Sequence, residues 1–252
     1  MHAVNRLFEY RKSLSTTEYK SRGYRLKRCG ECRLNEEHCT CAYLPNVKSP
    51  VSFLILMYDT EVMKPSNTGR LIADVIPDTH AFLWSRTVKN NALLDIIQNE
   101  KYQPVVVFPK DYADDGHVVI EQKMEVKPNK TPLFIMLDGS WREAKKMFRK
   151  SPYLKGLPIF SFSPAALDNS ETNSRYHIRK AANDTQLATA EVAARVLEIN
   201  GDSTNGQLLD HWFDVFSYQY QRTLCRENKG DAKALQSYLD FVKEHNISIG
   251  SA

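Results

Sequence analysis

Short apolar runs alternate with amphipathic stretches from residue 51 onward, whereas the first 48 residues hold no long apolar segment. Short apolar runs bounded by turn residues are typical of buried strands, and apolar positions three or four residues apart are typical of helices. The pattern predicts strands at 51–58, 80–84, 104–108, 133–137 and 158–162, and a hairpin strand at 117–121. It predicts helices at 66–76, 90–100, 140–150, 190–199, 206–226 and 231–245.

This alternation predicts an α/β fold, in which a mainly parallel sheet carries helices on both faces. We expect two parts, a basic N-terminal segment over 1–48 and an α/β domain over 49–252. In such sheets ligands bind beyond the carboxyl ends of the strands. The loops to inspect are therefore 107–110, 137–141 and 162–164, together with the long loop predicted at 163–187.

Charge and hydropathy narrow the class of protein. The longest apolar runs are too short to cross a bilayer, and the N-terminus lacks the apolar core of a signal peptide, so we expect a cytoplasmic protein. The formal charge of +4 is modest, but residues 1–50 hold 10 Lys or Arg against 5 Asp or Glu. A polyanionic partner is therefore permitted at that end. The sequence does not fix the oligomeric state, and a monomer is the default expectation.

Four of the five cysteines lie within 13 residues, at Cys29, Cys32, Cys39 and Cys41. In a chain without a secretory signal, such bunching favours metal ligation over disulfides, and four thiolates suit zinc best. The alternative is a set of reduced or redox-active cysteines without metal. A zinc ion with four cysteine ligands has no open position for water, so its role would be structural.

The segment LDGSWREAKKM at 137–147 joins a buried strand to a helix. Asp138 stands where a carboxylate can be held at the edge of the sheet, facing a ligand. Ser140 and Glu143 form a capping box, which explains Ser140 better than a catalytic hydroxyl does. The helix carries five basic residues, which are either a solvated face or phosphate contacts: Arg142, Lys145, Lys146, Arg149 and Lys150.

The residues DGSW at 138–141 resemble the D-x-[T/S]-W signature of the DTW-domain family of tRNA-uridine aminocarboxypropyltransferases. The cysteine cluster precedes the domain, as it does in bacterial members. The stretch 64–71 resembles the family's second motif, and 176–180 followed by 187–191 resembles its late motif. The resemblance covers about residues 25–225, with Ser140 in place of the commoner Thr and Ala190 where a bulkier residue is expected.

The resemblance implies a reaction and a fold. The reaction is transfer of the 3-amino-3-carboxypropyl group of S-adenosylmethionine to N3 of a uridine in tRNA, with methylthioadenosine leaving. The fold is SPOUT-like, with a knotted C-terminal half. Two alternatives stay open, a SPOUT-type RNA methyltransferase and a non-catalytic, zinc-dependent RNA-binding module. The sequence does not reveal which uridine is modified.

The resemblance also implies roles for individual residues. Asp138 would be the base that takes the N3 proton, with Ser140 and Trp141 beside it; outside the family, Asp138 would be expected only to bind loop amides. The residues expected around the cofactor are Phe108, Pro109, Leu137, Gly139, Trp141, Ile178 and Thr189, of which Thr189 has an alternative role as a helix cap. The residues expected on RNA are Arg28, Arg142, Lys145, Arg175, Arg179 and Lys180.

Overall fold

The structure is a computed structural model that describes residues 1–17, 19–20, 23–114, 116–162, 175, 178, 187–225 and 227–250. Its α-helices are α1 (Ala3–Ser13), α2 (Gly69–Val75), α3 (Asn91–Gln98), α4 (Trp141–Lys150), α5 (Thr189–Ile199), α6 (Ser203–Leu224) and α7 (Ala234–Glu244). Its strands are β1 (Pro45–Asn46), β2 (Ser52–Met57), β3 (Thr79–Leu83), β4 (Tyr102–Val107), β5 (Val119–Ile120), β6 (Thr131–Asp138), β7 (Ile159–Phe160) and β8 (Ser248–Ile249).

Six strands form one sheet in the order β3-β2-β6-β4-β7-β5, and every neighbouring pair runs parallel. The predicted α/β class with a mainly parallel sheet is therefore confirmed. The hairpin predicted at 117–121 is wrong, because β5 pairs in parallel with β7 at the edge of the sheet. A short apolar run gives the position of a strand, but its partner and direction depend on the chain that follows.

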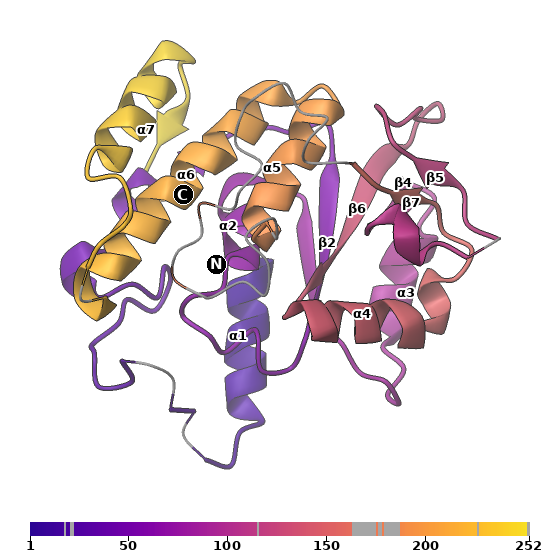
Figure 1. The fold of residues 1–252 in the computed structure, drawn as a ribbon, viewed down its shortest axis with the longest axis horizontal. Helices are drawn as coiled ribbons and strands as arrows, with labels where there is room; N and C mark the ends of the chain where they lie inside the picture. Colours follow the sequence, from indigo (N-terminus) through magenta and orange to yellow (C-terminus); the bar gives the residue numbers. More distant parts are fainter. Residues whose placement is uncertain are drawn as a thin grey trace.

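Alternate residues of the central strands supply two separate cores. In β2, Phe53, Ile55 and Met57 belong to the core shared with α2, α5 and α6, whereas Leu54 and Leu56 belong to the core shared with α3 and α4. This alternation follows from the two-residue period of a strand. Figure 1 shows the sheet between these two groups of helices. Burial on both faces explains why the predicted strands are apolar throughout.

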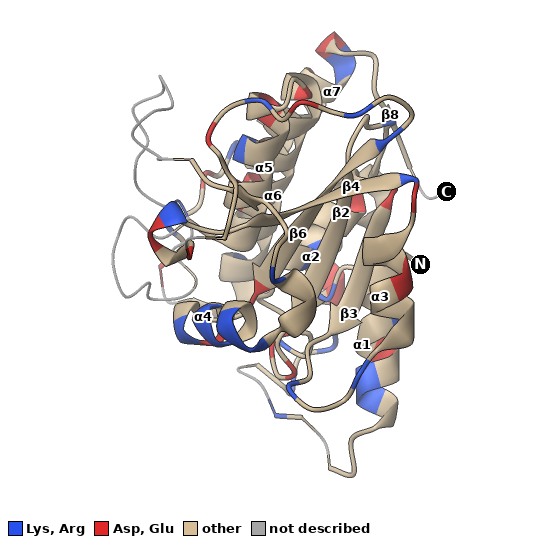
Figure 2. Ribbon diagram, turned by 90° about the vertical axis from the view of Figure 1, so that its right-hand side faces the viewer, with Lys and Arg blue, Asp and Glu red and all other residues tan. Residues whose placement is uncertain are grey.

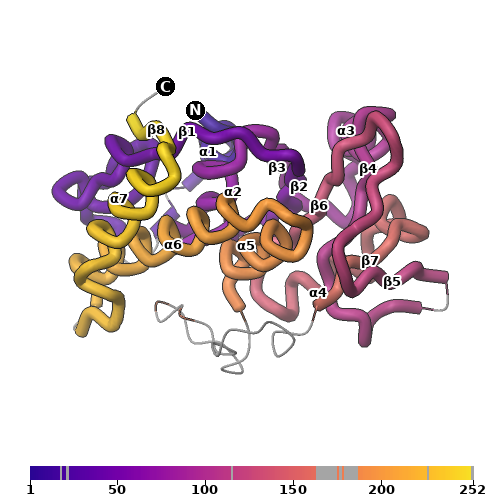
Figure 3. Tube along the Cα trace, turned by 90° about the horizontal axis from the view of Figure 1, so that it is seen from above, coloured from indigo at the N-terminus to yellow at the C-terminus, as the bar shows by residue number. Residues whose placement is uncertain are grey.

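The N-terminal helix α1 packs against β3 and α2. The strands β1 and β8 pair antiparallel, which places the end of the chain beside the segment that precedes β2. Figure 3 shows both termini on this side of the molecule. Among the described residues, no helix has the length and apolar character needed to cross a membrane.

Two helix starts differ from the predicted ones. Helix α2 begins at Gly69, three residues after the predicted start at 66, because the Asn67 side chain accepts a hydrogen bond from the backbone N–H of Arg70. Helix α5 has Ala188 at its N-cap, so the alternative role of Thr189 as a cap is wrong. Most of the loop predicted at 163–187 lies outside the described residues, and the predicted knot stays a prediction.

Candidate functional site

Asp138 ends β6, and its carboxylate lies against the starts of two helices. Its Oδ2 accepts a hydrogen bond of 2.6 Å from Nδ2 of Asn67, and its Oδ1 accepts one of 2.6 Å from Oγ1 of Thr189. A Cβ on Gly69, the first residue of α2, would lie only 2.8 Å from Oδ2. Asp138 is 2% exposed. One carboxylate thus connects three segments that are far apart in the sequence.

A second buried carboxylate lies beside Asp138. Nδ2 of Asn67 also lies 3.2 Å from Oε1 of Glu61, so both acids use the same amide nitrogen. Nζ of Lys64 lies 2.6 Å from Oε2 of Glu61. A buried carboxylate needs hydrogen bonds and a counter-charge, and these two neighbours supply them. Sequence analysis missed Glu61, because a lone acid in a turn has no pattern that marks it.

Aromatic rings gather on the other side of the DGSW segment. The ring of Phe108 stacks on Trp141 with centroids 5.5 Å apart, and on Phe148 with centroids 4.5 Å apart. Leu137 packs against the same core as these rings. Three of the residues expected around the cofactor, Phe108, Leu137 and Trp141, therefore share one apolar group next to Asp138.

The remaining residues expected around the cofactor are more dispersed. Ile178 packs against the core beneath α5, on the opposite face of the sheet from Trp141. Pro109 is half-buried and begins the turn after β4. Gly139 lies close to α4, since a Cβ there would be 3.1 Å from Cβ of Glu143. The predicted set thus spans both faces of the sheet, with Asp138 between them, and its role stays a prediction.

Helix α4 presents a basic face next to this site. The predicted capping box is confirmed, because the backbone N–H and the hydroxyl of Ser140 both donate to Oε2 of Glu143, at 2.7 and 2.6 Å. Figure 2 shows the concentration of basic residues on this helix. Arg142 is exposed, and Nζ of Lys145 lies 5.7 Å from the centroid of the Trp141 ring. Both cations are available to a polyanion.

The other predicted RNA contacts are placed differently. Arg28 is half-buried and donates to the backbone oxygen of Arg33 at 2.8 Å, and desolvation lowers the pKa of Arg28. Arg175 forms ion pairs with Asp210 and Asp214, at 2.8 and 2.7 Å. Two predicted contacts lie outside the described residues: Arg179 and Lys180. Arg28 and Arg175 thus serve internal contacts here, and their role on RNA stays a prediction.

The four clustered cysteines meet as the sequence predicts, with all their Sγ atoms within 4.8 Å of one another. Sγ of Cys29 lies 3.6 Å from Cys41, and Sγ of Cys32 lies 3.7 Å from Cys39. A tetrahedral zinc with bonds of about 2.3 Å would set its sulfurs about 3.8 Å apart. A hydrogen bond from Cys41 lowers the pKa of Cys32 to about 5, and the same contact raises the pKa of Cys41. The cluster fits a thiophilic dication.

Arg33 connects the cysteine cluster to the rest of the protein. It follows Cys32, is 4% exposed and has a φ of 58°, a left-handed conformation that is uncommon outside glycine. Its guanidinium donates to the backbone oxygen of Val62 at 2.8 Å and to Oδ1 of Asn5 at 3.1 Å. The cluster is thus fastened both to α1 and to the turn that carries Glu61.

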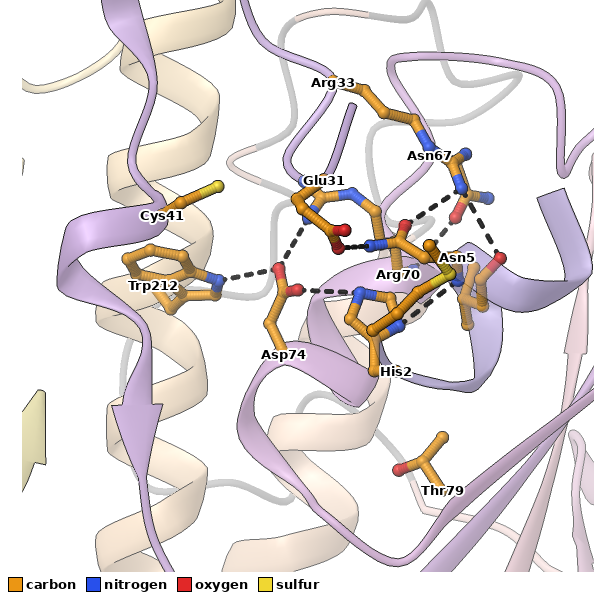
Figure 4. Close-up of polar contacts among 12 residues, drawn as sticks. His2, Asn5, Glu31, Arg33, Cys41, Asn67, Arg70, Asp74, Thr79 and Trp212 are labelled. Carbon is orange, nitrogen blue, oxygen red and sulfur yellow. Dashed lines mark hydrogen bonds and ion pairs between the residues drawn. The ribbon is translucent and has the colours of Figure 1, made fainter. Parts of the chain in front are cut away.

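The buried carboxylate of Asp74, in α2, connects this helix to the start of α1 and to α6 (Figure 4). Its carboxylate lies 2.7 Å from Nη1 of Arg70 and 3.0 Å from Nε2 of His2, and it accepts a 3.0 Å hydrogen bond from Nε1 of Trp212. Burial alone would raise the pKa of Asp74, but Arg70, His2 and Trp212 lower it to about 2. Arg70 therefore serves a contact that stabilises the fold.

These features define an α/β protein with a parallel sheet, an N-terminal cluster of four thiols and a buried carboxylate at the carboxyl edge of the sheet. The family model of the DTW domain matches residues 26–221. The chain therefore belongs to the DTW-domain family, the family of tRNA-uridine aminocarboxypropyltransferases, and the resemblance of 138–141 is confirmed. No solved structure matches the chain. The bacterial type and the SPOUT-like superfamily stay predictions.

Proposed function

We propose that this protein transfers the 3-amino-3-carboxypropyl group of S-adenosylmethionine to N3 of a uridine in tRNA. Membership of the DTW family implies a tRNA-modifying enzyme. The observation that carries the finer proposal is the buried carboxylate of Asp138, the first residue of the family signature, at the carboxyl edge of β6. That edge is where parallel α/β sheets bind their ligands.

The reaction forms a bond between N3 of the uridine and the γ-carbon of the donor. The bond from that carbon to sulfur breaks, and its electron pair stays on sulfur to give neutral methylthioadenosine. The N3 proton goes to Asp138. Three carbons beside a sulfonium are open to attack, so the carbon that faces the nucleophile decides between this reaction and methyl transfer.

Asn67 and Thr189 donate hydrogen bonds to the two oxygens of the Asp138 carboxylate and so hold it in one position. A fixed carboxylate removes the orientational cost of meeting the uridine. A carboxylate is a weak base for N3, so a cation that stabilises the developing uridine anion would assist it. Lys145, beside the Trp141 ring, is the candidate.

Other residues would bind the two substrates and the metal. Phe108, Leu137 and Trp141 form the apolar group that we assign to the adenosine of the donor. The basic face of α4, with Arg142 and Lys145, would contact tRNA phosphates. Zinc on the four cysteines would be structural, because all four tetrahedral positions are taken by sulfur. This reaction is expected in the cytoplasm, where the tRNA is.

The test is to incubate the protein with tRNA and S-adenosylmethionine and to weigh the digested nucleosides. We expect uridine with one added aminocarboxypropyl group, together with methylthioadenosine. Asp138→Asn should abolish this product while tRNA binding is largely kept, and the exposed control Asp95→Asn should behave as wild type. A methylated base with S-adenosylhomocysteine would refute the proposal in favour of a methyltransferase. Full activity of Asp138→Asn would refute the role of the carboxylate.

A further inference from the structure

A chain of hydrogen bonds leads from Asp138 to a lysine with no role in the reaction described above. Asn67 donates to Asp138 and to Glu61, and Lys64 donates to Glu61 at 2.6 Å. The Oδ2 of Asp138 and the Oε1 of Glu61 are separated by no more than the sum of two hydrogen bonds, 2.6 and 3.2 Å. Lys64 is therefore linked to the proposed base through two side chains, those of Glu61 and Asn67.

Exposure distinguishes the two members of the ion pair. The side chain of Glu61 is 2% exposed, whereas that of Lys64 is 31% exposed. The carboxylate thus lies behind the ammonium as seen from solvent. A ligand arriving at the carboxyl edge of the sheet can reach Lys64 while Glu61 stays covered.

The group that moves in the proposed reaction is a zwitterion, with an α-ammonium and an α-carboxylate on the carbon chain that is attacked. A protein that holds this chain beside a carboxylate base needs a cation for the α-carboxylate, because an unpaired negative charge near Asp138 and Glu61 would be repelled. Arg70 does not serve, since its guanidinium lies against Asp74.

We propose that Lys64 binds the α-carboxylate of the aminocarboxypropyl group and that Glu61 is a positioning residue that holds the Lys64 ammonium for it. This inference rests on the proposed function. A lysine makes point-charge contacts with three donors, so Lys64 keeps its bond to Glu61 while it donates to the ligand. S-adenosylmethionine would thus be recognised by its aminocarboxypropyl group, which is transferred, as well as by its adenosine.

Four small molecules separate this role from a general effect on the fold. S-adenosylmethionine and S-adenosylhomocysteine carry the α-carboxylate, whereas decarboxylated S-adenosylmethionine and methylthioadenosine lack it. Lys64→Met should weaken binding of the first two about 10- to 100-fold, the loss expected for one hydrogen bond between charged groups. Binding of the other two should change by less than about twofold, within the range of additive errors.

Removing the Lys64 side chain alone leaves the Glu61 carboxylate buried without the Lys64 ammonium, and this loss of a counter-charge could unfold the turn that carries both residues. The double variant Glu61→Gln/Lys64→Met avoids this and should show the same selective loss, with a melting temperature near that of wild type. Lys64→Arg should keep part of the affinity for S-adenosylmethionine. Glu61→Gln alone should raise the KM for S-adenosylmethionine with little change in kcat, because it acts through Lys64.

The matched control is Lys101→Met. Lys101 forms a comparable ion pair with Asp78, at 2.7 Å, but at the amino end of the strands. The Lys101→Met variant should bind all four molecules as the wild-type protein does. Equal weakening of all four by Lys64→Met, or none, would overturn the proposal for Lys64.

The transfer assay separates this proposal from the proposed function. In one outcome, Lys64→Met loses affinity only for the two molecules with an α-carboxylate, while the wild-type protein makes no aminocarboxypropyluridine. This outcome would refute the proposed reaction but keep Lys64 as the binding site for the α-carboxylate. A wild-type protein that binds none of the four molecules would overturn both.

Discussion

Adding one methyl group at Gly69 should move the Asp138 carboxylate without removing any polar atom. A Cβ built on Gly69 lies 2.8 Å from Oδ2 and 2.9 Å from Cγ of Asp138. Contacts this short do not occur between a Cβ and its neighbours, so one group has to shift. Asp138 is a short side chain held by Asn67 and Thr189, so the shift must break or lengthen one of those bonds.

The effects of Gly69→Ala on stability and on activity should differ in size. Overpacking costs about 1–3 kcal/mol, and the better helix propensity of Ala returns up to about 1 kcal/mol at the start of α2, so the protein should stay folded. A displacement of about 1 Å at a reacting group can reduce the rate about 100-fold. That loss corresponds to about 2.7 kcal/mol of transition-state stabilisation.

The assay compares kcat for modified uridine, measured by mass spectrometry of nucleosides, with the melting temperature and the affinity for S-adenosylmethionine. Gly116→Ala is the matched control, because its Cβ would meet only Oδ1 of Asp114 at an ordinary 3.7 Å. A Gly69→Ala protein with wild-type kcat would show that turnover does not depend on where the Asp138 carboxylate lies. Loss of activity only in proportion to unfolded protein would refute the steric reasoning as well.

Four further predictions concern the buried Asp74, the cysteine cluster and the Thr189 hydroxyl. Asp74→Asn should lower the free energy of unfolding by about 3–5 kcal/mol in urea titrations, the cost of leaving a buried partner charge unpaired. In the wild type, the folded pKa of Asp74 falls from 3.8 to about 2, so its contribution of about 2 kcal/mol should be complete above about pH 4 and lost as the pH falls toward 2. Cys32→Ser should release about one equivalent of zinc by elemental analysis and lower the melting temperature; wild-type protein free of zinc would contradict this. Thr189→Val should reduce kcat about 5-fold by removing one hydrogen bond worth about 1 kcal/mol from Asp138, and an unchanged kcat would exclude that bond from the reaction.

The strands at the centre of the sheet were predictable, because burial on both faces forces long apolar runs. Strand β6 and the helix that follows it also carry the family signature, so Asp138 and its position at the end of a strand could be found together. The capping box at Ser140 is a local pattern and was equally readable. The position of edge strand β5 was predicted as well, but its partner and direction were not, since two residues are too few to specify them.

The surroundings of Asp138 could not be read from the sequence. Asn67 and Thr189 come from segments on either side of it in the chain, 71 and 51 residues away, and only the packing of α2 and α5 on the sheet brings them together. Thr189 shows the difficulty, because a hydroxyl at a helix start is explained equally well by capping. The actual cap position belongs to Ala188, which leaves the Thr189 hydroxyl to bond the carboxylate.

The N-terminal segment is part of the architecture of the site, although it holds none of the proposed catalytic groups. Arg33 reaches from the cysteine cluster to the backbone oxygen of Val62, the residue after Glu61, while His2 reaches Asp74 at the end of α2. Both ends of the segment that carries Lys64 and Asn67 are thus fixed by residues that precede β1. Metal loss at the cysteines should therefore reach the donor site through Arg33, as a weaker affinity for S-adenosylmethionine that accompanies the lower melting temperature of Cys32→Ser. Unchanged affinity in the metal-free protein would show that α1 and the sheet hold this turn without the cluster.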